Sequence, residues 1–187
     1  MNVLEAIQIR RAVRAYTSEV IDEATVRRLL DAAVLAPNAM NEQAWLFSVV
    51  QNKDTLKRWS DRAKSLLLDQ TSADPKTQHY NPLLIDPNFN IFYDAGTLVV
   101  IASKVRGTYT DADCWLAAEN LMLAACEIGL GSCPIGFAVP VLNTPQVKKE
   151  LNLPESAVAV APIIVGRPRT MSARPPRSAP QVTTWLR

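Results

Sequence analysis

The sequence contains one histidine, His79, and three cysteines, Cys114, Cys126 and Cys133, which match no C-x-x-C metal or redox spacing. The single histidine excludes a histidine-rich metal site, and we expect no bound metal. Glu5 and Arg10 occupy the N-terminal stretch where a signal peptide needs an apolar run. We therefore expect a cytoplasmic protein whose thiols are reduced.

The chain also has little net charge, because its 187 residues carry a formal charge of +2. This value is too small to indicate a nucleic-acid partner through bulk electrostatics. No acidic residue follows Glu155, however, whereas the last part of the chain contains Arg167, Arg169, Arg174, Arg177 and Arg187. A nucleic-acid arm is therefore an alternative for this tail, and steep salt dependence of DNA binding would reveal it.

The composition, 48% hydrophobic and 20% charged, is that of an ordinary folded protein. We expect a single domain over residues 1–187. Residues 167–187 are rich in proline and arginine and cannot form a core. The tail contains Trp185 near its end, and we expect the tail to dock on another surface.

Periodicity and capping residues place helices and strands alternately along the chain. Asn2 with Glu5 forms a capping-box pattern, and Asp22 precedes a second amphipathic helix that should stop before Pro37. Further helices are expected over 54–68, over 111–128, and after Thr144-Pro145. Apolar runs predict strands at 45–50, 96–103 and 157–166, with a short irregular strand in 130–137. Residues 71–90 show no period and are expected to form a long loop or lid.

The predicted helix over 111–128 is apolar on nearly all of its faces, with only Asp113, Glu119, Asn120 and Glu127 between the apolar residues. These polar residues make a membrane span improbable. Two explanations for the apolar surface remain open. The helix is buried between two subunits, or it lies on a sheet beneath a second layer of helices.

Two blocks of sequence carry the functional signal. The first reads Arg10-Arg11-Ala12-Val13-Arg14-Ala15-Tyr16, and the second reads Ala36-Pro37-Asn38-Ala39-Met40-Asn41-Glu42-Gln43-Ala44-Trp45. Arg10 and Arg14 are expected to share one face at the end of the first helix, with Arg11 a quarter turn away. Such cations also commonly sit at a helix end only to offset its dipole. Taken together and in this order, the blocks resemble those of the FMN-dependent nitroreductase family.

The resemblance implies that the arginines divide the work of binding FMN. Arg10, together with Arg174 or Arg177 of the tail, would hold the phosphate. Arg14 would face the N1–C2 edge of the flavin and stabilise the negative charge of its reduced form. Arg11 is included in the FMN-binding set. Ala12 stands where the family often has a serine, so its contact to phosphate would come from the backbone N–H.

In the second block, the resemblance assigns Asn41 and Gln43 to the pyrimidine edge of the flavin. The alternative is a turn in which these amides satisfy their own backbone. The segment Pro37, Asn38 and Ala39 would reach the flavin held mainly by the other subunit, which implies a homodimer with two composite sites. Met40 would line the substrate pocket and make it larger and softer.

A third segment, Gly131-Ser132-Cys133-Pro134-Ile135-Gly136-Phe137, resembles the family's segment lying against flavin N5. Because Pro134 has no N–H, the donor to N5 would be the amide of Ile135 or Gly136. The glycines at 129 and 131 do not form a Rossmann fingerprint, since they follow a helix and the spacing to Gly136 is wrong.

The resemblance therefore implies an α+β fold with a central mixed β-sheet sandwiched by helices, assembled as an intertwined homodimer. The implied activity is that of an NAD(P)H-dependent FMN oxidoreductase, in which NADH or NADPH and a small acceptor such as a nitroaromatic or a quinone react in turn. No catalytic acid or base is required, because the flavin carries the chemistry. The alternatives are a flavin storage or sensing protein without turnover, and a specialised member such as a reductive dehalogenase.

Overall fold

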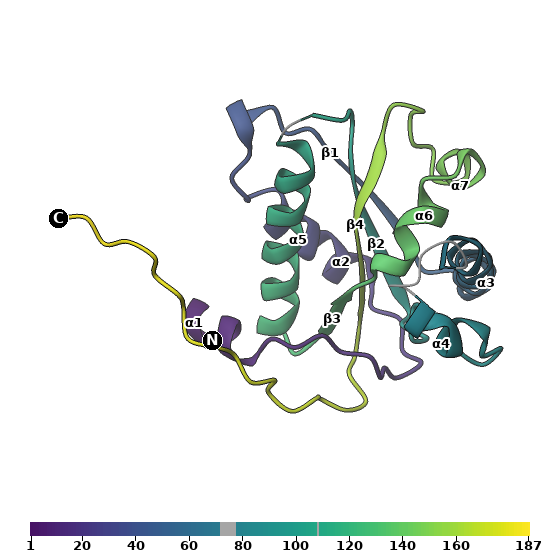
Figure 1. Ribbon diagram of the computed structural model, residues 1–187, viewed down its shortest axis with the longest axis horizontal. Helices are drawn as coiled ribbons and strands as arrows, with labels where there is room; N and C mark the ends of the chain where they lie inside the picture. Colours follow the sequence, from purple (N-terminus) through teal and green to yellow (C-terminus); the bar gives the residue numbers. More distant parts are fainter. Residues whose placement is uncertain (72–77, 108) are drawn as a thin grey trace.

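The computed structural model describes residues 1–71, 78–107 and 109–187, in which a central sheet lies between two layers of helices (Figure 1). The sheet contains β1 (Trp45–Val50), β2 (Thr97–Ser103), β3 (Gly131–Pro134) and β4 (Val158–Gly166). The order is β1-β2-β4-β3. The strands predicted from apolar runs are confirmed, and the two central ones, β2 and β4, are buried on both faces.

The expectation of a mixed sheet is wrong for these four strands, because all three neighbouring pairs are antiparallel. A parallel contact occurs as an isolated bridge between Ala12 and Ser132, beside β3. A continuous apolar run reports that both faces of a strand are covered, but it does not report the direction in which the strand runs.

One face of the sheet is covered by α5 (Thr110–Glu127), with α2 (Glu23–Ala33) and α1 (Val3–Ile9) packed beside it. Ala117, Ala118 and Leu121 of α5 are fully buried against the apolar side chains of β2 and β4. The sheet-facing explanation therefore accounts for most of the apolar surface of α5. Trp115 and Leu116 remain 43% and 45% exposed.

The helix ends follow the predicted capping chemistry. The capping box of Asn2 and Glu5 is present, and Asp22 caps α2 through the Thr25 N–H at 2.8 Å. At the end of α5, Gly129 has a φ of 76°, the left-handed conformation that glycine adopts most easily.

The other face is covered by α3 (Lys53–Thr71), α4 (Asn81–Ile85), α6 (Val139–Leu142) and α7 (Pro145–Glu150). Trp59 of α3 is 2% exposed, and its indole N–H donates to Glu150 of α7 at 3.0 Å. Three 3-10 turns complete the described elements: η1 (Ala39–Asn41), η2 (Gln78–Tyr80) and η3 (Gly136–Ala138).

The expectation of an irregular segment over 71–90 is wrong for part of that segment, because η2 and α4 are helical. Pro82 lies in the first turn of α4, where a helix tolerates proline without losing a hydrogen bond. Residues 72–77 lie outside the described residues.

Candidate functional site

The arginine block is not helical, which corrects the expectation that these residues share a helix face. α1 ends at Ile9, and Arg10 has φ −53° and ψ 133°. The chain then runs beside the sheet and is held by backbone hydrogen bonds. The Val13 N–H donates to the Ser132 carbonyl at 3.0 Å, and the Thr17 N–H donates to the Arg167 carbonyl at 2.9 Å. Tertiary packing overrides the local helix pattern here, because Val13 is only 1% exposed and packs directly against Gly131.

Arg11 makes a local contact. Its guanidinium donates to the carbonyls of Gln8 and Arg10, both at 2.7 Å, at the C-terminal end of α1. This is the helix-end role that isolated cations commonly have. The role of Arg11 in FMN binding stays a prediction.

Arg10 has unused hydrogen-bonding capacity that fits an anion. Its Nε is buried and makes no hydrogen bond among the described residues, although Glu119 Oε1 lies 3.3 Å away. The Ser132 hydroxyl is also buried without a partner in the described part of the chain. The neighbouring Ala12 N–H also has no hydrogen-bond acceptor among the described residues. Unsatisfied donors beside a guanidinium fit the phosphate of FMN.

Arg14 is exposed, and its guanidinium carbon lies 5.9 Å from the ring centre of Tyr93. Both residues line a cavity of about 280 Å³ that also contains Asn88, Phe89 and Arg169. Tyr93 and Asp94 have φ values of 52° and 55°, so the loop that carries them turns sharply towards Arg14. Sequence reasoning missed this wall, because nothing in the local pattern of residues 88–94 indicates a left-handed turn.

The segment 131–136 lies close to both arginines. Burial raises the pKa of the Cys133 thiol, and the positive charges of Arg14 and Arg10 oppose the rise. The Ile135 N–H donates to Pro162 at 2.9 Å, so it is already used within the fold. Gly136 faces open space, with no atom within 4 Å of where a Cβ would stand, and its N–H has no acceptor among the described residues. Of the two predicted donors, Gly136 therefore fits the close approach of a flavin ring, with Pro134 beside it.

The amide loop lies at the opposite end of α5 from α1 (Figure 1). The Ala39 N–H donates to Asp113 in the first turn of α5 at 3.2 Å, whereas Cys126 in the last turn contacts the Ala6 carbonyl. Asp113 and Cys126 are 13 residues apart, which corresponds to ~20 Å of helix. Arg10 itself lies 3.3 Å from Glu119, which is ~9 Å of helix from Asp113, so the arginine block reaches the middle of α5 whereas the amide loop contacts its first turn.

Within the amide loop, some polar groups satisfy one another. Asn38 accepts a hydrogen bond from the Gln43 N–H at 2.9 Å, and Asn41 accepts one from the Gln43 side chain at 3.3 Å. Met40, Asn41 and Gln43 all have positive φ, and Met40 is 91% exposed. Pro37 is also exposed. These contacts correspond to the alternative expectation, a turn whose amides bond to groups of the turn itself. The exposed side chains of Asn41 and Gln43 keep further donors and acceptors.

The tail carries Arg174 and Arg177 away from both motifs. Residues 170–187 form no helix or strand and are exposed, and in Figure 1 the chain passes α1 and then leaves the body of the molecule. Trp185 is 74% exposed. The phosphate-binding role of the two arginines stays a prediction.

Among the described residues, no group of three or more His, Cys, Asp or Glu side chains is placed to hold a metal ion. Within the same residues, no helix has both the length and the apolar character needed to cross a membrane.

Known proteins resemble the chain over most of its length. Residues 7–167 match the model of the Nitroreductase family. A protein of Archaeoglobus fulgidus, named as an NADH dehydrogenase/NAD(P)H nitroreductase, is 30% identical over 173 residues, covering 89% of this chain and 85% of its own. A similarly named protein of Methanothermobacter thermautotrophicus is 27% identical over 168 residues, covering 90% and 78% respectively.

A solved structure shares the fold. The crystal structure of a nitroreductase with bound FMN from Bacteroides fragilis superposes with a TM-score of 0.83 at 26% identity, covering 100% of this chain and 98% of the other. The family match spans both the arginine block and the amide loop, and the fold match spans the whole chain. This chain therefore belongs to the Nitroreductase family.

Proposed function

We propose that this protein transfers electrons from NAD(P)H to a nitroaromatic, a quinone or a similar small acceptor. As a member of the Nitroreductase family it is an NAD(P)H-dependent oxidoreductase with FMN as its cofactor. The FMN, when bound, supplies the hydride chemistry. One observation carries the proposal: Arg10 and Arg14 lie near the segment 131–136, which ends at the open Gly136. In that region Arg10 Nε and the Ser132 hydroxyl are buried without a hydrogen-bond partner among the described residues.

Each of these residues has a distinct part in the proposal. The Arg10 guanidinium, beside the Ala12 N–H, binds the phosphate end of the cofactor, for which a fork of N–H donors is well suited. Gly136, which has open space beside it, would offer its N–H to the flavin N5. Arg14 would hold its cation near the N1–C2 edge, where a fixed positive charge favours the reduced flavin.

We propose a homodimer in which each site takes residues from both chains. The amide loop contacts the first turn of α5 whereas Arg10 lies beside its middle, which supports this arrangement because a second copy can bring its own loop to the ring. Exposed apolar side chains on α1 and α5 also support it: Val3, Leu4, Ile7, Trp115 and Leu116. The exposed tail, with Trp185 and its arginines, would then dock on the partner.

The visible spectrum of the purified protein is the first test. A yellow protein that releases FMN, and not FAD, on denaturation is expected. A colourless protein that does not bind added FMN would overturn the FMN site. Bound flavin that NADH and NADPH do not reduce would support the storage or sensing alternative.

Steady-state kinetics tests the order of the reaction. Parallel double-reciprocal lines are expected, because donor and acceptor take turns over one flavin face. Intersecting lines would indicate two separate sites. A panel of nitroaromatics, quinones and halogenated phenols identifies the acceptor class, and exclusive turnover of the halogenated compounds would favour the dehalogenase alternative.

A further inference from the structure

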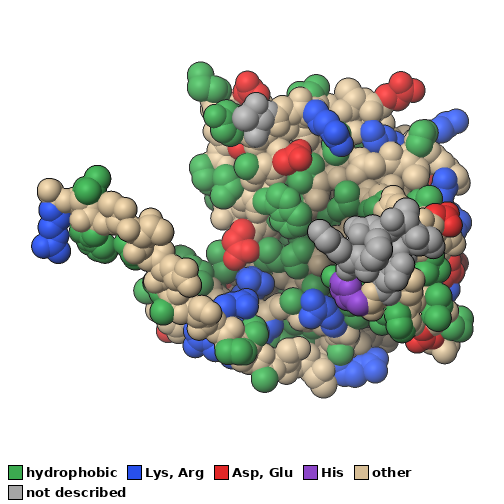
Figure 2. All heavy atoms as spheres, viewed as in Figure 1, with side chains coloured by type: hydrophobic (Ala, Val, Ile, Leu, Met, Phe, Trp, Pro, Cys, Tyr) green, Lys and Arg blue, Asp and Glu red, His purple; other side chains and the backbone are tan. Residues whose placement is uncertain are grey.

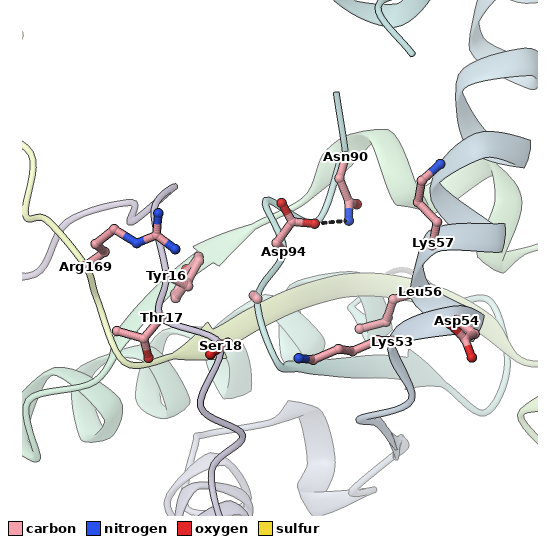
Figure 3. A pocket seen from close by; sticks show the side chains of 11 residues that line it. Tyr16, Thr17, Ser18, Lys53, Asp54, Leu56, Lys57, Asn90, Asp94 and Arg169 are labelled. Atoms are coloured by element: carbon pink, nitrogen blue, oxygen red, sulfur yellow. Dashed lines mark hydrogen bonds between the residues drawn. The ribbon is translucent and has the colours of Figure 1, made fainter. Parts of the chain in front are cut away.

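A second cavity of about 370 Å³ lies next to the proposed flavin site and is lined by polar side chains (Figure 3). Four separate segments form it: the extended stretch 16–18, the first turn of α3, the loop 90–95, and the chain just after β4. None of these residues belongs to the predicted FMN-binding set. The cavity therefore needs an explanation of its own.

Two cations face this cavity with no competing partner. Neither the Lys53 ammonium nor the Arg169 guanidinium makes a side-chain hydrogen bond or ion pair with the described residues. In Figure 3, Lys53 extends across the cavity towards Ser18, and the Arg169 side chain lies beside Tyr16. The hydroxyls of Thr17 and Ser18 lie on the same wall.

The other charged groups of the lining are directed elsewhere or already bonded. Asp94 accepts a hydrogen bond from the Asn90 amide at 2.8 Å, and Lys57 is paired with Asp61 at 2.5 Å. Asp54 and Lys57 point away from the side of the cavity where Lys53 and Arg169 lie (Figure 3). The Thr17 hydroxyl accepts a hydrogen bond from the Glu19 N–H at 3.4 Å and keeps its own O–H to donate. Two cations and two hydroxyl donors thus remain, a set that matches a phosphate dianion.

This cavity adjoins the one that contains Arg14. Tyr16, Asn90, Asp94 and Arg169 line both cavities. A ligand extending from the flavin would therefore have a planar ring near Arg14 and an anionic group near Lys53. A nicotinamide dinucleotide combines a planar ring with phosphate groups in this way.

We propose that the cavity binds a phosphate monoester and that its source is the 2′-phosphate of NADPH. The proposal rests on the use of a nicotinamide donor and adds a preference for NADPH over NADH, which lacks this group. The Lys53 ammonium and the Arg169 guanidinium hold the dianion, and the Thr17 and Ser18 hydroxyls donate to its remaining oxygens.

Lys53→Gln tests the proposal against Lys57→Gln, which removes the same charge from the same helix one turn later. For Lys53→Gln, KM for NADPH should rise by about tenfold or more, the scale of one lost hydrogen bond to a charged group. KM for NADH should change by less than about twofold. Lys57→Gln should leave both values near wild type, and Lys53→Arg should restore most of the NADPH preference. Equal effects of Lys53→Gln on the two donors would overturn the proposal.

Calorimetry of small probes gives a readout independent of turnover. Adenosine 2′,5′-bisphosphate should bind wild-type protein more tightly than adenosine 5′-monophosphate, and Lys53→Gln should remove the difference. Inorganic phosphate that binds as tightly as the bisphosphate, without inhibiting NADPH oxidation, would show a free-anion site and overturn the assignment to the donor. If neither donor reduces the flavin, the proposed function fails; if both do and Lys53→Gln changes nothing, this inference alone fails.

Discussion

The two helical layers differ in how completely the chain covers them. Among the described residues of α3, α6 and α7, no large hydrophobic side chain is exposed, and Trp59 and Leu142 are at most 2% exposed. On the other side, α1 and α5 leave Val3 and Leu4 69% exposed and Trp115 43% exposed. Leu83 and Ile85 of the short helix α4 are 41% and 65% exposed, so the α3 layer is completed within one chain except at α4. The α5 layer retains an apolar surface of the kind that marks an interface.

The two layers also differ at one buried charged group. On both sides most charges form pairs, such as Arg58 with Glu150 at 2.5 Å on the α3 side and Arg28 with Glu127 at 3.2 Å on the α5 side. On the α5 side, Arg10 meets Glu119 without a hydrogen bond from its buried Nε. Figure 2 shows basic side chains gathered on the face between the layers, beside the sole histidine. The buried donor without a hydrogen bond among the described residues, Arg10 Nε, thus lies on the side that lacks a complete cover.

The double substitution Trp115→Ser with Leu116→Ser should have the largest effect on this contrast. It removes two apolar side chains from each subunit, and each has a little under half of its surface left to bury, at 43% and 45% exposed. Four such side chains at ~0.7–1.5 kcal/mol each would weaken the dimer by about 3–6 kcal/mol. Sedimentation equilibrium should then show monomer, with loss of bound flavin. Val49→Ser is the control, since Val49 is similarly exposed, at 39%, on strand β1. A flavin-loaded monomer of the wild type would contradict the composite site.

Deletion of residues 174–187 should have the next largest effect. It removes Arg174 and Arg177 together with Trp185, so FMN affinity should fall by about 3–6 kcal/mol if each arginine is worth ~1.5–3 kcal/mol. The dimer should also dissociate more easily, because the deletion removes the segment proposed to dock on the partner. Full FMN affinity in the truncated protein would show that the tail has no part in the site.

The sequence predicted the strands and the caps, because these depend on local features such as apolar runs, Asn2, Asp22 and Gly129. The sandwich of helices around a sheet came from the family resemblance. The sequence did not predict the end of α1 at Ile9, which is decided by Val13 packing on Gly131, a contact across 118 positions. It also did not predict the antiparallel direction of all four strands, since direction depends on the long connections. Arg10 and Arg14 lie near the 131–136 segment, whereas Arg174 and Arg177 lie in the exposed tail, so the FMN-binding role of the arginines stays a prediction. The wall formed by Asn88, Tyr93 and Arg169 was missed, because it depends on a left-handed turn.

Arg14→Ala and Arg177→Ala should separate two functions of the proposed site. Loss of Arg14 should lower the flavin reduction potential by about 30–60 mV, equivalent to ~1.4–2.8 kcal/mol for a two-electron couple, while FMN stays bound. Loss of Arg177 should weaken FMN affinity by about 1.5–3 kcal/mol with little change in potential. Potentiometric and fluorescence titrations measure the two quantities. An unchanged potential in Arg14→Ala would show that Arg14 does not face the N1–C2 edge.

Cys114→Ala should have the smallest effect, and it is visible only at alkaline pH. Burial raises the pKa of the Cys114 thiol to about 12, with a further contribution from Asp111 and Asp113. Because the folded state favours the neutral thiol, Cys114 contributes to the free energy of unfolding. This contribution is complete below the unfolded pKa of 9.0 and is lost as pH rises through about 12. Between pH 8 and pH 10, the wild type should therefore lose about 1 kcal/mol more unfolding free energy than Cys114→Ala.

Urea unfolding at both pH values measures this difference, with Cys126→Ala as a matched control. Burial raises the pKa of Cys126 as well, but Arg10 and Arg11 oppose the rise, so its effect should be smaller. Identical pH slopes in the wild type and Cys114→Ala would show that this thiol does not contribute to alkaline destabilisation.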